Sequence, residues 1–201
     1  MRSTVLMAAA LVVAAAISSA SAQQPTTRVR GTIEKLDGNV LVVKSRDGAE
    51  LHITLTDNAQ VVGVEKAALS DITVGSFVGS AAMPQPDGTQ KALEVHIFPE
   101  SMRGTGEGHR PYAPVPQSTM TNGTVGNAVT GVEGHAIHVK YRDGEKKILV
   151  APDVPIVRYV IGTRDELKPG AAITITAATK KPDGTLETGR VNVGRNGVVP
   201  Q

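Results

Sequence analysis

The sequence predicts an all-β protein that consists of two tandem, small five-stranded barrels of the OB type, each with one short helix. Three observations lead to this prediction: most of the chain is an internal duplication, apolar residues alternate with polar ones along short runs, and Asp-Gly turns separate these runs. Alternation with a period of two is typical of strands that bury one face. Short strands separated by regular turns are typical of barrels and sandwiches.

The duplication is visible as two similar segments 96 positions apart. "LDGNVLVVKSRDG" at 36–48 aligns with "VEGHAIHVKYRDG" at 132–144, and "PDGT" at Pro86 aligns with "PDGT" at Pro182 at the same spacing. Repeated turn residues at one offset indicate a duplicated domain. The predicted units are barrel repeats over 27–98 and 123–194, a Gly/Pro-rich connector over 99–122 and a C-terminal tail over 195–201.

The middle of each copy contains strand patterns and one segment without alternation. In the first copy, the apolar run 40–43 is followed by "RDG" and then by Leu51, Ile53 and Leu55, which alternate with other residues. This pattern predicts a strand, a tight turn and a strand. The segment "VEKAALSDI" at 64–72 lacks the alternation and predicts a short helix or helical turn, as does "GTRDEL" in the second copy.

The end of each copy predicts a hairpin. "FVGSAAM" and "ALEVHIF" flank "PQPDGTQ" in the first copy, and "AAITITAAT" and "ETGRVNV" flank "KPDGT" in the second. Proline followed by Asp-Gly favours a turn between two strands. Each copy therefore has the predicted order strand, strand, strand, short helix, strand, strand, which is the order of an OB barrel with a core that about 70 residues can fill.

The same segments carry a family resemblance. "GTIEKLDGNVLVVKSRDG", "LSDITVGSFV", "DGT" and "LEVHIF" resemble an exported bacterial barrel-repeat family whose defining domain has no assigned function. "MRGTGEGHRPY" followed by "STMTNGTV" is similar to a segment between the two copies in members of that family. The resemblance covers nearly all of the chain after its N-terminal segment, and it implies two tandem OB-like domains joined by this connector.

The N-terminal segment predicts export. Arg2 supplies a basic start, an apolar run covers Val5 to Ile17, and Ala20 and Ala22 form an A-x-A cleavage pattern. The apolar run of about 13 residues is shorter than the roughly 20 residues that a membrane-spanning helix needs. We expect residues 1–22 to be a Sec-type signal peptide cleaved after Ala22, a periplasmic or secreted mature protein, and no later membrane span.

Composition excludes two classes of function. The chain has no cysteine, so thiol catalysis, disulfides and cysteine-ligated zinc are excluded. Its 21 basic residues nearly balance its 19 acidic ones, and it has no tryptophan, two phenylalanines and three tyrosines. A nucleic-acid-binding protein normally has a basic excess and, for single strands, aromatic stacking platforms. We therefore expect no nucleic-acid partner.

The connector is the first candidate site, for an anion or a partner. Its alternate glycines free the backbone to present successive N–H groups as an anion-binding nest, and neighbouring arginines add positive charge. The alternative is that such a segment is a flexible linker. The candidate contact residues are Arg103, Gly104, Gly106, Gly108, Arg110 and Tyr112.

A metal site is the second candidate. Methionine and histidine together suit copper(I) outside the cytoplasm, and histidine also binds zinc(II). The candidate ligands are Met102, His109 and Met120. His52 and His96 alternate with apolar neighbours, so we expect both on solvent-facing sides of strands.

Three functional hypotheses follow from the sequence. The first is an exported, non-enzymatic accessory or binding protein of the cell envelope, with an envelope protein or a small ligand as its partner and no resident cofactor. The second is periplasmic handling of copper or zinc by the connector. The third is an enzyme acting on an envelope polymer, for which the chain offers no catalytic motif and no catalytic residue can be named.

Overall fold

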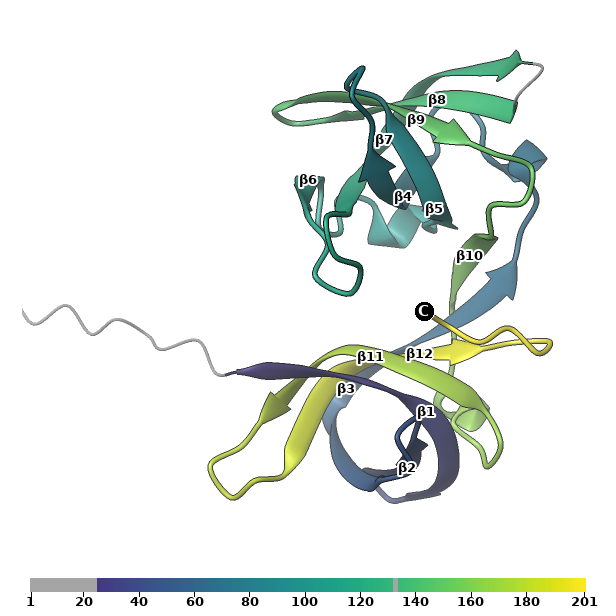
Figure 1. The fold of residues 1–201 in the computed structure, drawn as a ribbon. Coiled ribbons are helices and arrows are strands. Elements are labelled where there is room, and N and C mark those ends of the chain that lie inside the picture. The colour runs from purple at the N-terminus through teal and green to yellow at the C-terminus, as the bar shows by residue number, and fades with distance from the viewer. Residues whose placement is uncertain (1–24, 132–133) are drawn as a thin grey trace, which may run out of the picture.

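The computed structural model describes residues 25–131 and 134–201, and these residues form an all-β structure with three short 3₁₀ turns (Figure 1). The signal peptide predicted over 1–22 lies outside the described residues. Within the described part of the chain, no helix is long and apolar enough to cross a membrane. The elements are β1 Thr26–Asp37, β2 Val40–Ser45, β3 Glu50–Lys66, η1 Leu69–Asp71, β4 Phe77–Pro84, β5 Gln90–Ile97, η2 Glu100–Met102, β6 Gly108–Pro111, β7 Thr119–Gly131, β8 Gly134–Tyr141, β9 Gly144–Val150, β10 Ile156–Ile161, η3 Arg164–Glu166, β11 Ala172–Lys180 and β12 Leu186–Gly194.

Five strands close into a barrel. β1 pairs with β2 and with β11, β2 pairs with β3, and β11 pairs with β12, all antiparallel. β12 then closes the ring by pairing in parallel with β3, from Leu186 opposite Ile53 to Gly194 opposite Val64. Closure removes the exposed edges that an open sheet of this size would present to other chains. The all-β class and a closed five-stranded barrel were predicted, and both are confirmed.

This barrel takes strands from both of the segments that are predicted to be copies of one repeat. β1, β2 and β3 belong to the first copy, whereas β11 and β12 belong to the second. The prediction of one barrel over 27–98 and another over 123–194 is therefore wrong in its boundaries. The physical reason is the length of β3, which continues for 17 residues and carries the first copy out of the barrel before its hairpin begins.

The remaining strands form a second lobe, which is the upper one in Figure 1. β4 and β5 come from the first copy, and β7, β8 and β9 come from the second. Antiparallel pairs join β5 to β4, β4 to β7, β7 to β8 and β8 to β9. A short parallel contact then joins β9 back to β5, at Gln90–Lys91 opposite Ile148–Leu149. The exchange of strands between the copies is thus reciprocal.

The two copies cross where β3 pairs with β10. The antiparallel ladder places Gly63 opposite Val160 and Val64 opposite Tyr159. At the 96-residue offset of the repeat, the equivalents of Gly63 and Val64 are Tyr159 and Val160, so each copy meets its own counterpart here. The crossing is therefore an approximate two-fold centre, and β10 also pairs with β5 in parallel.

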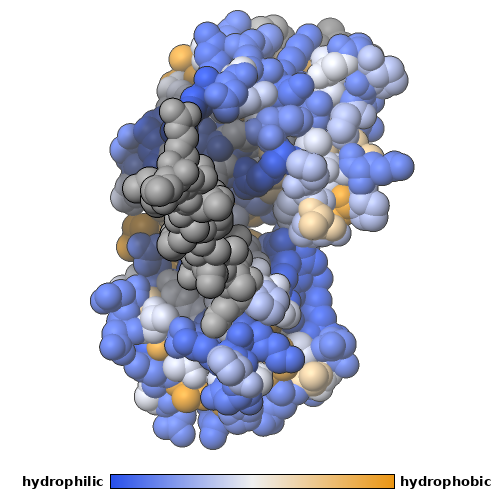
Figure 2. Space-filling view, turned by 90° about the vertical axis from the view of Figure 1, so that its left-hand side faces the viewer, coloured by the Kyte–Doolittle hydropathy of each residue, from blue (hydrophilic) through white to orange (hydrophobic). Residues whose placement is uncertain are grey.

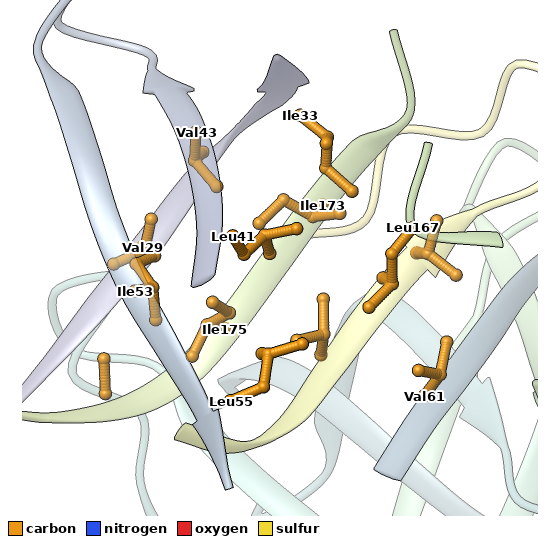
Figure 3. Close-up of a cluster of buried hydrophobic side chains, with 13 residues drawn as sticks. Val29, Ile33, Leu41, Val43, Ile53, Leu55, Val61, Leu167, Ile173 and Ile175 are labelled. Atoms are coloured by element: carbon orange, nitrogen blue, oxygen red, sulfur yellow. The ribbon is translucent and has the colours of Figure 1, made fainter. Parts of the chain in front are cut away.

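Each lobe has its own apolar core. In the barrel, side chains from all five strands point toward one another (Figure 3), and Leu41, Ile53 and Ile175 have no exposed surface. Leu167, which follows η3, packs into this core although η3 lies outside the ring of strands. The second lobe buries a separate cluster that includes Val78, Val95, Val125 and Ile137. Each core therefore contains residues from both copies.

Helical structure is shorter than predicted. The segments expected to form a helix in each barrel contain only the 3₁₀ turns η1 and η3, so the prediction of one short helix per barrel is wrong in type but right in position. In each turn a carboxylate accepts a hydrogen bond from a backbone N–H three residues earlier: Asp71 from Ala68 at 2.9 Å, and Glu166 from Thr163 at 3.0 Å. These caps stabilise a single turn, and Gly75 and Gly170, both at positive φ, lie where each chain turns toward the next strand.

An arginine in the C-terminal tail ties the crossing to η3. Arg195 donates two hydrogen bonds to Glu166, both at 2.8 Å, and one to Glu65 at 2.7 Å. A Cβ on Gly63 would lie 2.5 Å from the Arg195 Nε atom, so the guanidinium packs directly over this glycine. These hydrogen bonds lower the pKa of the Glu166 carboxyl and raise the pKa of Arg195.

The ion pair between Glu166 and Arg195 predicts that the free energy of unfolding depends on pH. Because the folded-state pKa of Glu166 lies below its ordinary value of 4.5, its stabilisation is present above that pH and is lost as pH falls through the lower folded-state pKa. We expect Glu166→Gln to reduce the free energy of unfolding by about 1–2 kcal/mol at pH 7, and by less near pH 3. Urea denaturation at both pH values measures this difference.

Glu187→Gln is the matched control for this prediction. Glu187 forms a single 2.8 Å pair with Lys181 on the barrel surface, where an ion pair contributes little to stability. An equal loss in both variants, or a loss from Glu166→Gln that grows toward pH 3, would contradict the assigned role of Glu166.

The strand exchange predicts how a single copy behaves. Residues 23–98 alone contain β1 to β5 but lack the β11 and β12 strands that close the barrel. Because β3 continues without a break past the barrel, we expect this fragment to form a dimer that repeats the exchange between two molecules. Light scattering coupled to size-exclusion chromatography measures its mass, and a stable folded monomer would show that one copy closes on itself.

Candidate functional site

A cleft of about 790 Å³ lies between the barrel and the second lobe. Figure 2 shows the surface narrowing to a waist between the lobes, with hydrophobic residues exposed beside it. Its volume is in the range of small-molecule pockets, which often lie between lobes or domains. Its walls come from seven parts of the chain. They are Arg30 on β1, Lys66–Leu69 at and after the end of β3, Ala81 on β4, Leu93 and Glu94 on β5, Tyr112, Pro114 and Val115 in the connector, 151–157, and the C-terminal residues Val198, Val199 and Gln201.

A cluster of polar and aromatic side chains on β5 and β10 lies behind Glu94, which lines the cleft. The Glu94 carboxylate lies 3.1 Å from Nε2 of His96, and both side chains are largely buried. The His96 ring stacks on Tyr159 at 5.1 Å between centroids, and Tyr159 in turn meets Phe98 edge-on at 5.1 Å. Burial is the main cause of a raised pKa at Tyr159, and Glu94 raises it further. Tyr159 therefore remains neutral and acts as a rigid aromatic support.

The position of His96 differs from its expected one. Its alternation with Val95 and Ile97 predicted a solvent-facing side chain, but only 8% of His96 is exposed. The side chain does point away from the core of the second lobe, as alternation requires. It is buried because β10 pairs beside β5 and its Tyr159 covers the outer face, which is a contact between the two copies that alternation cannot reveal.

The connector is folded against the second lobe. η2 begins it, and β6 then pairs with β7, with Gly108 opposite Asn122 and Pro111 opposite Thr119. The turn between β6 and β7 is closed by the N–H of Tyr112, which donates to the Ser118 carbonyl at 2.9 Å. Because of this pairing, the tip of the β6–β7 turn, with Tyr112 and Val115, lies at the cleft.

In the predicted anion nest, the two arginines already form hydrogen bonds with other groups of the protein. Arg103 donates to both Glu100 carboxylate oxygens, at 2.6 and 2.7 Å, and to the Gly75 carbonyl at 2.9 Å. Arg110 donates to the Gly106 carbonyl at 2.6 Å. The pKa of Glu100 is lowered by its hydrogen bond from Arg103. These two arginines therefore hold the connector in place.

The three connector glycines have a structural role. Gly104, Gly106 and Gly108 all have positive φ, at 84°, 55° and 128°, which side-chain-bearing residues rarely adopt. Of the predicted contact residues, only Tyr112 lies in the cleft. Its hydroxyl lies 3.5 Å from an Nη atom of Arg28, across the gap between the lobes.

Two of the predicted metal ligands, His109 and Met120, lie on opposite faces of the β6–β7 ladder. Met102 and Met120 are buried, at 6% and 7% exposed. His109 is opposite Thr121 in the β6–β7 ladder, whereas Met120 is opposite Arg110. Directly opposite residues share a face and successive residues alternate, so His109 and Met120 lie on opposite faces. Across the described ranges, no group of three or more histidine, aspartate or glutamate side chains is arranged to hold a metal ion.

Sequence reasoning missed the residues that line the cleft. Arg30, Glu94 and Leu93 were not singled out, because each lies on a strand that looked like an ordinary half-exposed strand. One signal was present: Arg28 and Arg30 alternate with the core residue Val29, which places two arginines on the outer face of one strand. The exposed Leu93, at 37%, was a second weak signal.

His109 gives a direct test of the connector's placement. Its Nδ1 atom lies 2.8 Å from the Thr121 hydroxyl and its ring stacks on Tyr141. Burial lowers the pKa of His109 below 6.5, and Lys146 lowers it further. We expect an NMR pH titration to show this low pKa, and Lys146→Ala to raise it only part of the way toward 6.5 because burial is the larger cause.

Lys147→Ala is the control, because Lys147 lies on the opposite face of β9. A pKa of His109 at or above 6.5, or an equal rise in the Lys147→Ala variant, would show that the connector is not packed as described.

Comparisons of the chain with protein-family models, with curated proteins and with solved structures found no significant match. The resemblance to the exported barrel-repeat family therefore stays an expectation from the motifs. The function of this protein has to be argued from the geometry of the cleft and of the surfaces beside it.

Proposed function

We propose that this chain is an exported, non-enzymatic binding protein of the cell envelope, built of two OB-like barrels that exchange strands, with the cleft between them as its binding site. One observation carries the proposal. The cleft has the volume of a ligand pocket and takes its walls from both copies, the connector and the C-terminal tail, so it exists only in the complete fold. The N-terminal signal-peptide pattern supports export.

The chemistry of the cleft favours binding over covalent catalysis. Among the described residues that line it, none is a serine, threonine, histidine or cysteine, so a hydroxyl or thiol nucleophile activated by histidine is not present there. The walls are mostly aliphatic, from Leu69, Leu93, Val115 and Val154, with charge at few positions. Such a surface suits an amphiphilic small ligand or a short extended segment of a partner.

The rival hypotheses have less support. Metal handling by the connector required convergence of Met102, His109 and Met120, which the β6–β7 register does not provide. An enzyme acting on envelope polymers would need an acid and a base in the cleft. Of the two carboxylate side chains among the described residues that line it, Glu94 is already engaged by His96, which leaves Asp153.

Substitution of an exposed cleft residue tests the proposal. Leu93→Asp places a charge on the apolar wall at a residue that is already 37% exposed, so the fold should tolerate it. The purified mature protein is screened by thermal shift against peptidoglycan fragments, lipopolysaccharide, phospholipid vesicles and extended peptides. A ligand at 100 times its Kd stabilises the protein by about 2.7 kcal/mol, which is readily detected.

We expect one class of these ligands to raise the Tm and to bind Leu93→Asp at least tenfold more weakly. Val74→Asp is the control, since Val74 is also apolar and exposed, at 65%, but does not line the cleft. Equal loss in both variants, or binding that neither variant changes, would place the binding site elsewhere. Turnover of any of these ligands would contradict the non-enzymatic assignment.

A further inference from the structure

Three arginines gather on the outer face of the barrel. Val29 is buried in the barrel core, so its neighbours Arg28 and Arg30 on β1 point outward. Arg46 follows β2, and its N–H donates to the Arg30 carbonyl at 3.1 Å. The neighbouring pair, Gly31 opposite Ser45, sets the register that places Arg46 opposite Arg30. Like charges at directly opposite positions of a sheet are destabilising.

None of these three arginines forms an ion pair. Within residues 25–131 and 134–201, no carboxylate oxygen lies within ion-pair distance of Arg28, Arg30 or Arg46. The Nε atoms of Arg28 and Arg30 are buried and have no hydrogen-bond partner. By contrast, Arg103, Arg158 and Arg195 are all ion-paired.

The electrostatics of Arg30 agree with this geometry. Burial lowers the pKa of Arg30, and the neighbouring charges of Arg28 and Arg46 lower it further, while Tyr112 and Glu94 act in the opposite direction. A folded protein gains nothing from holding cations together in this way, because a buried donor without an acceptor costs free energy. An anion placed between the guanidinium groups would remove both costs.

The arginines line a groove that an anionic ligand can enter. The groove has a volume of about 710 Å³, and it joins the cleft at Arg30 and Pro114. Its only carboxylate among the described residues is Asp47, which accepts a hydrogen bond from the Ser45 hydroxyl and is held in the turn. The apolar part of the groove is formed by Val29, Leu51, Ala113, Pro114 and Leu186.

We propose that Arg28, Arg30 and Arg46 form a binding site for the phosphoryl group of a ligand that lies in this groove. Guanidinium groups present paired N–H donors that match the oxygens of a phosphate. A phosphate monoester or pyrophosphate carries close to two or more negative charges at pH 7, so it offsets three cations better than a single carboxylate does. The Tyr112 hydroxyl, beside Arg28, supplies one further donor from the connector.

This site does not depend on the cleft having a ligand of its own. The phosphoryl group can belong to a soluble compound, such as a phosphorylated sugar, or to the headgroup of a lipid. Both sources present phosphate oxygens to the guanidinium groups, with a single negative charge on the phosphodiester of a lipid and about two on a phosphate monoester, and they also differ in whether binding requires a membrane surface.

The test uses the full mature chain and four probes: inorganic phosphate, pyrophosphate, and vesicles of phosphatidylglycerol or of phosphatidylcholine. Calorimetry measures the soluble anions and co-sedimentation measures the vesicles, at 50 and at 200 mM salt. Arg30→Gln and Arg46→Gln each remove one guanidinium. Arg142→Gln is the matched control, because Arg142 is an exposed arginine of the second lobe whose guanidinium lies outside the groove.

We expect saturable binding of pyrophosphate or of phosphatidylglycerol vesicles, weakened at least tenfold by Arg30→Gln and by Arg46→Gln and less than twofold by Arg142→Gln. Without ligand, Arg30→Gln should melt at the same or a higher temperature than the wild type, because it relieves a repulsion. Binding of pyrophosphate without vesicle binding identifies a soluble ligand, and selective binding of phosphatidylglycerol vesicles identifies a lipid; both results support the phosphoryl site.

Three results would overturn the proposal. The first is the absence of saturable binding to any of the probes. The second is equal weakening by Arg142→Gln, which would indicate attraction to net charge rather than a site. The third is a lower Tm of Arg30→Gln without ligand, which would show that the arginines stabilise the fold.

Discussion

The antiparallel ladder between β3 and β10 is the interaction on which the rest of the structure depends. It places Val64 opposite Tyr159 at the crossing of the two copies, and it lets each copy send its last two strands into the other lobe. Gly63 has no side chain, which leaves room for the Arg195 guanidinium over the backbone at the crossing. Arg195 then joins β3 to η3 through Glu65 and Glu166. The β3–β10 ladder thus supplies backbone hydrogen bonds at the crossing, and Arg195 braces the barrel side of it.

Both candidate binding surfaces are consequences of this exchange. The cleft forms where the barrel, the second lobe and the connector approach one another, and the groove adjoins it at Arg30 and Pro114. The same approach buries the outer face of β5, so that His96 and Glu94 become part of an interface instead of a solvent-facing surface. A pair of independent barrels on a flexible tether would have neither feature. The ordered connector, with Tyr112 at its tip, completes the wall.

The arginines fall into two groups: some form ion pairs with carboxylates of the fold, and others do not. Arg103 and Arg195 each have carboxylate partners within hydrogen-bond distance. Arg28 and Arg30 have buried Nε atoms without acceptors, on a strand whose inward face is well packed. The connector was the expected anion site because glycine and arginine occur together there. The structure instead places its glycines at positive φ and its arginines in local hydrogen bonds, because a short segment folded onto β7 needs both.

The sequence by itself determined the all-β class, the positions of most strands and Asp-Gly turns, and where η1 and η3 lie, because alternation and turn residues depend on residues that are near one another in the chain. It did not determine which strands close the barrel. Since the two copies have similar strands, β11 and β12 can pair with β1 and β3 in the same manner as β4 and β5 could, and no local pattern distinguishes the partners. The tertiary structure decided between them through the uninterrupted length of β3 and its pairing with β10. The cleft, the buried His96 and the grouping of Arg28, Arg30 and Tyr112 follow from that long-range choice, which is why the sequence alone could not place them.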